Sequence, residues 1–88
     1  KTDLVVYPNP MIGQSVIEFS TANSEKILVS VYDRLGKQVR TWLHNGNLSA
    51  GRQMIIWAGD DDVGQPLSDG IYLVRVACEV RRMVILNK

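Results

Sequence analysis

Hydrophobic and polar residues alternate along most of this chain, and glycine or proline separates the alternating stretches in nearly every case. Alternation with a period of two puts every second side chain on the same side of an extended backbone, so each stretch predicts a β-strand with one buried face. No stretch carries a helical period long enough to form a helix. The predicted strands are Leu4–Tyr7, Ser15–Ser20, Lys26–Tyr32, Gln38–His44, Gly51–Trp57, Ile71–Cys78 and Val80–Leu86.

The clearest local signal is the stretch Val31–Val39 in the middle of the chain. Asp33 can accept a hydrogen bond from the backbone two residues on, and Gly36 can adopt a positive φ at no steric cost. The residues on either side favour extended backbone, so the stretch predicts a β-hairpin with a loop of roughly three to five residues. The alternative is a short helix from Asp33, which Gly36 would interrupt within one turn.

Short strands at regular spacing, with glycine and proline in the connections, predict an all-β fold, an antiparallel β-sandwich. The run Tyr7–Pro10 lacks two backbone donors, which predicts that the first strand lies at an edge or a corner. Ile71–Cys78 is rich in β-branched residues and is the best candidate for a central strand. The more apolar faces predict a core that includes Ile17, Phe19, Val29, Val31, Trp57, Tyr72 and Val74.

Composition excludes several classes of partner. The 88 residues carry ten Lys and Arg against nine Asp and Glu, a net charge of +1, with the basic residues scattered along the chain. This balance gives no electrostatic footprint for nucleic acid or an anionic membrane, and the apolar runs are too short to span a bilayer. The length allows one domain, residues 1–88, and the absence of an initiator methionine leads us to expect a piece of a longer polypeptide or a processed product.

No motif for catalysis is present. One cysteine, Cys78, and one histidine, His44, allow neither an internal disulfide nor a cysteine–histidine zinc site. His44 has no nucleophile or acidic partner at a readable spacing, and Cys78 ends an apolar strand, where an inert buried thiol is commoner than a nucleophile. The sequence therefore predicts a protein that is not an enzyme and that uses no cofactor.

An acidic loop after Trp57 is the one candidate metal site. Asp60, Asp61 and Asp62 follow one another, and clustered carboxylates are the ligands that hard cations prefer. Counted from Asp60, however, the positions of glycine and of the twelfth residue do not match the EF-hand pattern. Asp60 and Asp62 are therefore weak metal candidates, and an acidic surface turn is the preferred interpretation.

Trp42 and Trp57 are open to two interpretations. Aromatic side chains can stack on sugar rings, as they do in carbohydrate-binding modules. Trp57 alternates with Ile55 in a predicted strand, however, and this favours packing in the core.

Several separated motifs are more specific together than any one of them alone. They are the opening Tyr7–Pro10, the hairpin Val31–Val39, the run Ala50–Trp57, the strand start Ser68–Tyr72 and the closing run Met83–Lys88. In this order they resemble the C-terminal sorting domain of cargo proteins of the type IX secretion system of Gram-negative bacteria. The related immunoglobulin-like module of flagellar hook-capping proteins shares the first two motifs and the Gly-x-Tyr strand start. Ala58 departs from both families, in which an aspartate usually follows the tryptophan.

The resemblance implies an immunoglobulin-like antiparallel β-sandwich of about seven strands, acting as a non-catalytic C-terminal secretion signal. It implies passage of the cargo through the periplasm and across the outer membrane to a secreted or cell-surface destination. Removal by a sortase-like peptidase would occur upstream of this domain. The implied partners are the secretion translocon, that peptidase and an N-terminal cargo domain in the same chain, with no nucleic acid and no direct membrane insertion.

In the sorting family, the last strand is the part that the secretion machinery is thought to read. A terminal strand with a free end can offer its edge to a partner by β-augmentation, while alternate residues complete the core. Two alternative functions remain open, an accessory module of an extracellular enzyme or adhesin, which binds glycan or supports a neighbour, and a hook-capping-type assembly domain. Carried over to this sequence, the implied recognition residues are Gly70, Tyr72, Met83, Val84, Ile85, Leu86, Asn87 and Lys88.

Overall fold

The computed structural model describes residues 3–21, 26–45, 51–77 and 79–86. The described residues form seven strands and no helix, and hence no helix that could cross a membrane. The strands are β1 (Val5–Tyr7), β2 (Ser15–Thr21), β3 (Lys26–Asp33), β4 (Gln38–Asn45), β5 (Gly51–Trp57), β6 (Gly70–Val76) and β7 (Glu79–Ile85). These bounds confirm the seven predicted strands, each displaced by at most two residues at an end, because alternation marks the strand interior better than its ends.

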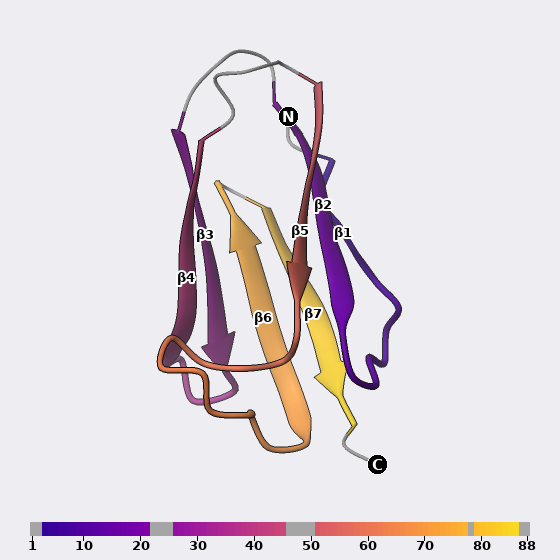
Figure 1. Cartoon of the computed structure of the whole chain (residues 1–88), viewed down its shortest axis with the longest axis vertical. Helices are drawn as coiled ribbons and strands as arrows, with labels where there is room; N and C mark the ends of the chain where they lie inside the picture. The colour runs from indigo at the N-terminus through magenta and orange to yellow at the C-terminus, as the bar shows by residue number, and fades with distance from the viewer. Residues whose placement is uncertain (1–2, 22–25, 46–50, 78, 87–88) are drawn as a thin grey trace.

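The strands form two sheets that pack face to face (Figure 1). One sheet has three strands in the order β1-β2-β5, and the other has four in the order β4-β3-β6-β7, with every strand pairing antiparallel. β1 is an edge strand and β6 lies inside its sheet, so both predicted placements are confirmed. The predicted antiparallel β-sandwich is therefore correct.

The core lies between the two sheets, where the inward residues of the strands meet. All seven residues predicted to be buried are buried, and Phe19, Val29 and Val74 are fully shielded from solvent. The prediction was incomplete, because it omitted several inward residues of the predicted strands and also Met11, which lies outside them. The additional buried apolar residues are Leu4, Met11, Ile27, Val76, Met83 and Ile85.

The β3–β4 hairpin turns as its sequence predicts. Asp33 N donates to Lys37 O at 2.9 Å, and Gly36 N donates to Asp33 O at 3.0 Å. The Asp33 carboxylate accepts hydrogen bonds from Leu35 N and Lys37 N, both at 2.9 Å, and Gly36 has a φ of 87°. The carboxylate thus satisfies two amides that a tight turn leaves without a strand partner, and glycine supplies the positive φ.

Candidate functional site at the last strand

The last strand, β7, is an edge strand of the four-stranded sheet and has two different faces. Met83 and Ile85 point inward and are buried in the core. Val80, Arg82 and Val84 occupy the alternate positions and point to the outer face of the sheet. The strand thus contributes to the core with one face while it presents the other to solvent, as alternation allows.

The outer edge of β7 is covered by the segment that follows β1. Asn9 Nδ2 donates to Arg82 O at 2.8 Å, and Val84 N donates to Asn9 Oδ1 at 3.0 Å. Next to this, Met11 pairs with Ile85 in a parallel bridge, in which Met11 N donates to the carbonyl of residue 84 at 2.8 Å and the amide of residue 86 donates to Met11 O at 3.0 Å. Four hydrogen bonds therefore close the C-terminal half of this edge.

The chemistry of the Tyr7–Pro10 run explains why a side chain, that of Asn9, forms the hydrogen bonds to the edge of β7. Pro8 and Pro10 have no backbone N–H, so this part of the chain cannot form an ordinary ladder with β7. The Asn9 side chain is a primary amide with both a donor and an acceptor, and it substitutes for a peptide group. The chain can then leave the three-stranded sheet at Tyr7 and reach the four-stranded sheet at Met11.

This arrangement corrects one expectation about the last strand. We expected its edge to be available for β-augmentation, but backbone groups of Arg82, Val84 and Leu86 already have partners within the chain. A strand added by a partner at these positions would have to displace Asn9 and Met11. The sequence could not show this, because Asn9 lies far from Val84 along the chain.

The beginning of β7 is held by the residues before β1. The Glu79 carboxylate accepts hydrogen bonds from Asp3 N at 3.1 Å and Leu4 N at 3.2 Å, and it forms an ion pair with Arg81 Nη2 at 3.0 Å. The same carboxylate therefore fixes the start of the chain's first strand against the last one. Both ends of β7 are tied to residues that precede β2.

The opposite edge of the four-stranded sheet, formed by β4, is covered in a similar way by the acidic loop. Asp62 N donates to Val39 O at 3.1 Å, and the Asp62 carboxylate accepts a hydrogen bond from Thr41 N at 3.0 Å. Asp62 thus adds one backbone and one side-chain hydrogen bond to the edge of β4. Asn9 and Asp62 protect the two edges of one sheet, where unpaired backbone groups would otherwise invite association with other chains.

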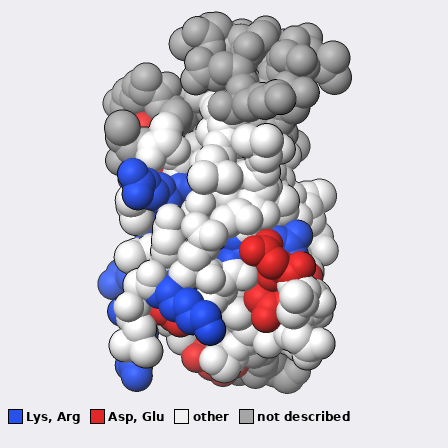
Figure 2. Space-filling view, turned by 90° about the vertical axis from the view of Figure 1, so that its left-hand side faces the viewer, with Lys and Arg blue, Asp and Glu red and all other residues white. Residues whose placement is uncertain are grey.

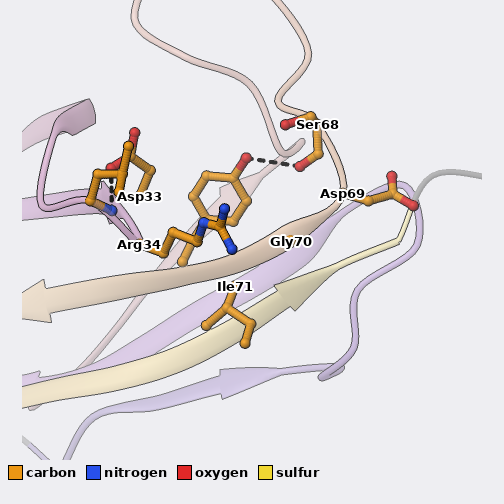
Figure 3. Close-up of a pocket in the computed structure, with 8 residues that line it drawn as sticks. Asp33, Arg34, Ser68, Asp69, Gly70 and Ile71 are labelled. Atoms are coloured by element: carbon orange, nitrogen blue, oxygen red, sulfur yellow. Dashed lines mark hydrogen bonds between the residues drawn. The ribbon is translucent and has the colours of Figure 1, made fainter.

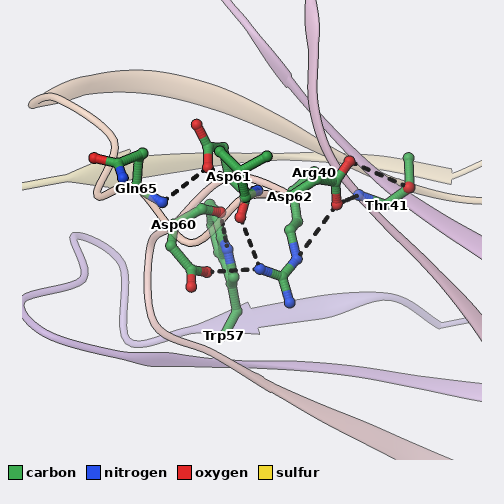
Figure 4. A network of polar contacts seen from close by, with 8 residues as sticks. Arg40, Thr41, Trp57, Asp60, Asp61, Asp62 and Gln65 are labelled. Atoms are coloured by element: carbon green, nitrogen blue, oxygen red, sulfur yellow. Dashed lines mark hydrogen bonds and ion pairs between the residues drawn. The ribbon is translucent and has the colours of Figure 1, made fainter.

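Arg40 occupies the centre of the acidic loop (Figure 4). Its Nη1 lies 3.0 Å from Asp60 Oδ1 and donates to Asp61 O at 2.9 Å, and its Nε lies 3.7 Å from Asp62 Oδ1. The Asp61 carboxylate accepts hydrogen bonds from Val63 N and Gln65 N, so it closes the turn itself. In the space-filling view, acidic and basic side chains lie next to one another on this side of the molecule (Figure 2).

Asp60 and Asp62, the weak metal candidates, are therefore already paired with the guanidinium of Arg40. No group of three or more metal-binding side chains comes together in the part of the chain that the structure describes. The arrangement matches the acidic surface turn, in which the carboxylates position the loop against β4. The sequence did not identify Arg40 as their partner, because Arg40 lies on β4, 20 residues before Asp60.

The two tryptophans belong to different sheets and meet edge to face, with ring centroids 6.2 Å apart and an interplanar angle of 89°. Trp57 is buried, and its Nε1 donates to Asp60 O at 2.9 Å. Trp42 is half-buried and has the Arg40 guanidinium 4.7 Å from its ring centre. Core packing is confirmed for Trp57, so the two rings do not form an exposed platform for a sugar.

Gly70 and Tyr72, two of the implied recognition residues, line a pocket of about 510 Å³ at the turn end of the four-stranded sheet (Figure 3). Arg34 and Asp69 line it from the β3–β4 turn and from the loop before β6. The Tyr72 hydroxyl donates to Ser68 O at 2.8 Å, which anchors the loop. The remaining implied residues divide between the core (Met83 and Ile85) and half-buried positions (Val84 and Leu86), while Asn87 and Lys88 lie outside the described residues.

A polar network lies on the outer face of the three-stranded sheet. The Tyr7 hydroxyl donates to Glu18 Oε1 at 2.6 Å, and Arg52 Nε and Nη2 both lie 2.9 Å from Glu18 Oε2. The hydrogen bond from Tyr7, followed by those from Arg52, lowers the pKa of Glu18. The same hydrogen bond, with burial and the charge of Glu18, raises the pKa of Tyr7. The carboxylate therefore remains ionised and paired at neutral pH.

Comparison with known families gives one match. A family model described as the FlgD Ig-like domain matches residues 12–80. The matched range includes strands β2 to β6, and it leaves out Asn9 and all but the first two residues of β7. No curated protein matches the chain at a significant level.

Several solved structures share the fold, among them the following three. A dimeric latent PorU from Porphyromonas gingivalis aligns with a TM-score of 0.86 at 20% identity, covering 99% of this chain and 9% of the PorU chain. PorZ from the same organism, described as an essential surface component of the type-IX secretion system, aligns at 0.65 and 17% identity, covering 96% and 11%. FlgD from Pseudomonas aeruginosa aligns at 0.58 and 16% identity, covering 94% and 71%. This chain thus spans only a small part of PorU and PorZ.

Proposed function

The chain belongs to the FlgD Ig-like domain family, and we propose that it is a non-catalytic C-terminal secretion signal of the type IX secretion system. In this role it directs an N-terminal cargo protein across the outer membrane to the cell surface. The translocon recognises it as a folded module, and a sortase-like peptidase then removes it by cleavage upstream. The implied recognition residues on β6, β7 and the terminal residues carry the signal.

One observation carries the proposal more than any other. The fold matches 99% of this chain to a segment that makes up only 9% of PorU, so the same module forms a small part of a much longer bacterial protein. The likeness to PorZ, described as a component of the type-IX secretion system, supports the same assignment. A sandwich stabilised along both edges of one sheet also suits a signal that must remain folded while it is recognised.

The second candidate is an assembly or accessory module. The match to the FlgD Ig-like domain favours it, as does the alignment with P. aeruginosa FlgD over 71% of that chain. A module of this kind would hold a neighbouring domain or subunit in place and would have no part in export. The glycan-binding version is less favoured, because Trp57 is buried.

The test is a deletion at the end of the chain. Removing Asn87 and Lys88 takes away two polar terminal residues, and such a change costs little stability. We expect the shortened domain to melt at nearly the parent temperature while the cargo attached to it accumulates in the periplasm. The matched control replaces both residues by alanine, which keeps the chain length and separates the terminal side chains from the terminal backbone.

The melting curve shows whether the deleted chain is folded, and this decides how its secretion result is interpreted. Normal surface delivery of a deleted chain that is still folded rejects the sorting function at the position proposed for it. It would support the accessory or assembly module, which should deliver its cargo regardless of these two residues. The melting temperature is measured on the same preparation, so that a failure of export is attributed to recognition only in a folded domain.

A further inference from the structure

A partner can bind β7 without displacing Asn9 and Met11 if it contacts the outer face of that strand. β7 and its neighbour β6 form this face, and we call it the arginine–aliphatic face. Alternation gives its members, and their registers show which of them lie opposite one another. The members are Ile71, Leu73 and Arg75 on β6, and Val80, Arg82 and Val84 on β7.

Charged and aliphatic side chains alternate across the face. Leu73 lies opposite Arg82, and Arg75 lies opposite Val80. Ile71, near the start of β6, is 46% exposed. Directly opposed residues in an antiparallel pair have close side chains, so each guanidinium stands beside an aliphatic group. The result is an exposed surface in which two cations are spaced between apolar contacts.

Among the described residues, the two arginines of this face have no acidic partner. Arg75 Nε donates to Ala77 O at 3.1 Å, and the carbonyl of Arg82 accepts the hydrogen bond from Asn9. In the described part of the chain, neither guanidinium pairs with a carboxylate, and no outward position of β3, β6 or β7 carries Asp or Glu. A partner that covers these arginines must therefore supply anions, because an unpaired buried charge is costly.

The outer face of the three-stranded sheet provides a contrast. It also exposes apolar side chains, among them Met54 and Ile56. Its central carboxylate, however, is already paired, since Glu18 has both Tyr7 and Arg52 as partners. In the described residues of that face no charge is left unpaired to specify a partner, whereas those of the arginine–aliphatic face include two.

We propose that the arginine–aliphatic face docks a protein surface that carries carboxylates between aliphatic side chains. The inference rests on the proposed secretion function and adds the chemistry of the partner that reads the last strand. Arginine suits such an interface, because its planar guanidinium binds carboxylates in a bidentate manner and its stem packs on apolar groups. In such an interface the arginines provide specificity and the aliphatic residues provide contact area.

The test neutralises the face in the full chain fused behind a cargo reporter. The variant is Arg75→Gln with Arg82→Gln, and the matched control is Lys37→Gln with Arg52→Gln, which removes the same charge away from the face. We expect the face variant to lower surface delivery by about tenfold or more, because complementary charges set specificity. The control should deliver normally. Arg75→Lys with Arg82→Lys keeps the charges but loses the bidentate geometry, so its delivery should fall between that of the parent and that of the glutamine variant. Melting temperatures of all variants establish that each is folded.

The comparison with the terminal deletion separates the two proposals. Normal delivery of the folded face variant, with periplasmic accumulation of the chain that lacks Asn87 and Lys88, overturns the docking face and leaves the secretion function standing. Normal delivery of both variants overturns the secretion function as well. An equal loss in the Lys37 and Arg52 control would show that total charge matters and would also overturn the docking face.

A lipid headgroup is the other anion that two arginines could meet. Vesicles of phosphatidylglycerol, incubated with the purified chain and sedimented, test this directly. We expect the chain to remain in the supernatant. Binding to the vesicles that disappears in the Arg75→Gln, Arg82→Gln variant would assign the face to a lipid surface and would overturn the protein partner.

Discussion

Asn9 Oδ1 accepts a hydrogen bond of 3.0 Å from the backbone amide of Val84, a residue 75 positions further along the chain. The other half of the same side-chain amide donates to the carbonyl of Arg82 at 2.8 Å. An asparagine between two prolines thus replaces a stretch of backbone in closing a sheet. This contact links the opening motif of the sequence to the strand proposed as the signal.

Replacing Asn9 should therefore weaken the last strand in a graded way. Asn9→Ala removes both hydrogen bonds, and we expect a loss of roughly 1–3 kcal/mol in the free energy of unfolding. Asn9→Asp keeps the acceptor for Val84 N and loses the donor to Arg82 O, so its loss should be smaller. Urea denaturation measures both, and amide hydrogen exchange at Val84 should quicken in the alanine variant. An aspartate variant less stable than the alanine variant at neutral pH would contradict this account.

Trp57→Ala should be among the most damaging substitutions in the core. The side chain is 1% exposed, and its removal leaves a large cavity, so we expect a loss of about 3–5 kcal/mol. That is a large part of the stability of so small a domain. Met54→Ala in the same strand is the control, because Met54 is 60% exposed and should cost about 0.5 kcal/mol or less. Thermal melts of the two variants within a few degrees of each other would show that Trp57 does not anchor the core.

Stability should fall at both ends of the pH range because of the Tyr7–Glu18 pair. The folded state lowers the pKa of Glu18 below its usual 4.5, so this contribution is present above pH 4.5 and is lost as the pH falls through the lowered value. The folded state raises the pKa of Tyr7 above 10.0, so that contribution is present below pH 10.0 and is lost as the pH rises through the raised value.

Two substitutions separate these limbs in denaturant melts recorded across the pH range. Glu18→Gln should flatten the acid limb, because no carboxylate remains to be protonated at this position. Tyr7→Phe should flatten the alkaline limb and, by removing the hydrogen bond to Glu18, should also make the acid limb shallower. An unchanged acid limb in Glu18→Gln would show that other carboxylates govern acid unfolding.

The acidic loop should bind calcium no more tightly than an ordinary surface, because the Arg40 guanidinium already pairs with Asp60 and Asp62. Isothermal titration of the chain with calcium chloride should return no micromolar site, since the loop lacks the six to eight converging oxygens that calcium prefers. Such a site, lost in Asp60→Ala or Asp62→Ala, would overturn this expectation. Asp33→Ala, which alters a carboxylate in another turn, is the control for nonspecific charge effects.

The parts of the fold that the sequence predicted are those set by neighbouring residues. Alternation gave the strands and the inward faces, and Asp33 with Gly36 gave the hairpin, because the groups that interact lie within four positions of each other. Met11 was missed as a core residue because it lies in an irregular segment with no period to place it. The partners of Asn9 and of Asp60 and Asp62 were missed because their contacts join segments that lie far apart in the sequence.

The same limit applies to the candidate site. The resemblance named residues of the last strand, but it could not say which of them are buried. Alternation supplies that division, and the structure places Met83 and Ile85 in the core. The hydrogen bonds of Asn9 to β7 had one local indication in the sequence, since Asn9 is a polar residue between two prolines, which have no backbone N–H groups. This pattern indicates that the side chain forms hydrogen bonds in place of the backbone, but it does not identify the strand to which it binds.

The perpendicular indoles of Trp42 and Trp57 also give this protein an intrinsic optical probe. Trp42 is on β4 and Trp57 is on β5, which belong to different sheets, and their ring centroids are 6.2 Å apart. Fluorescence therefore reports whether the two layers are in contact, while far-ultraviolet circular dichroism reports the hydrogen-bonded ladders within each layer. A state in which the layers separate but the ladders survive would change its emission first, so the two spectroscopies together can resolve the opening of the sandwich from the loss of its strands.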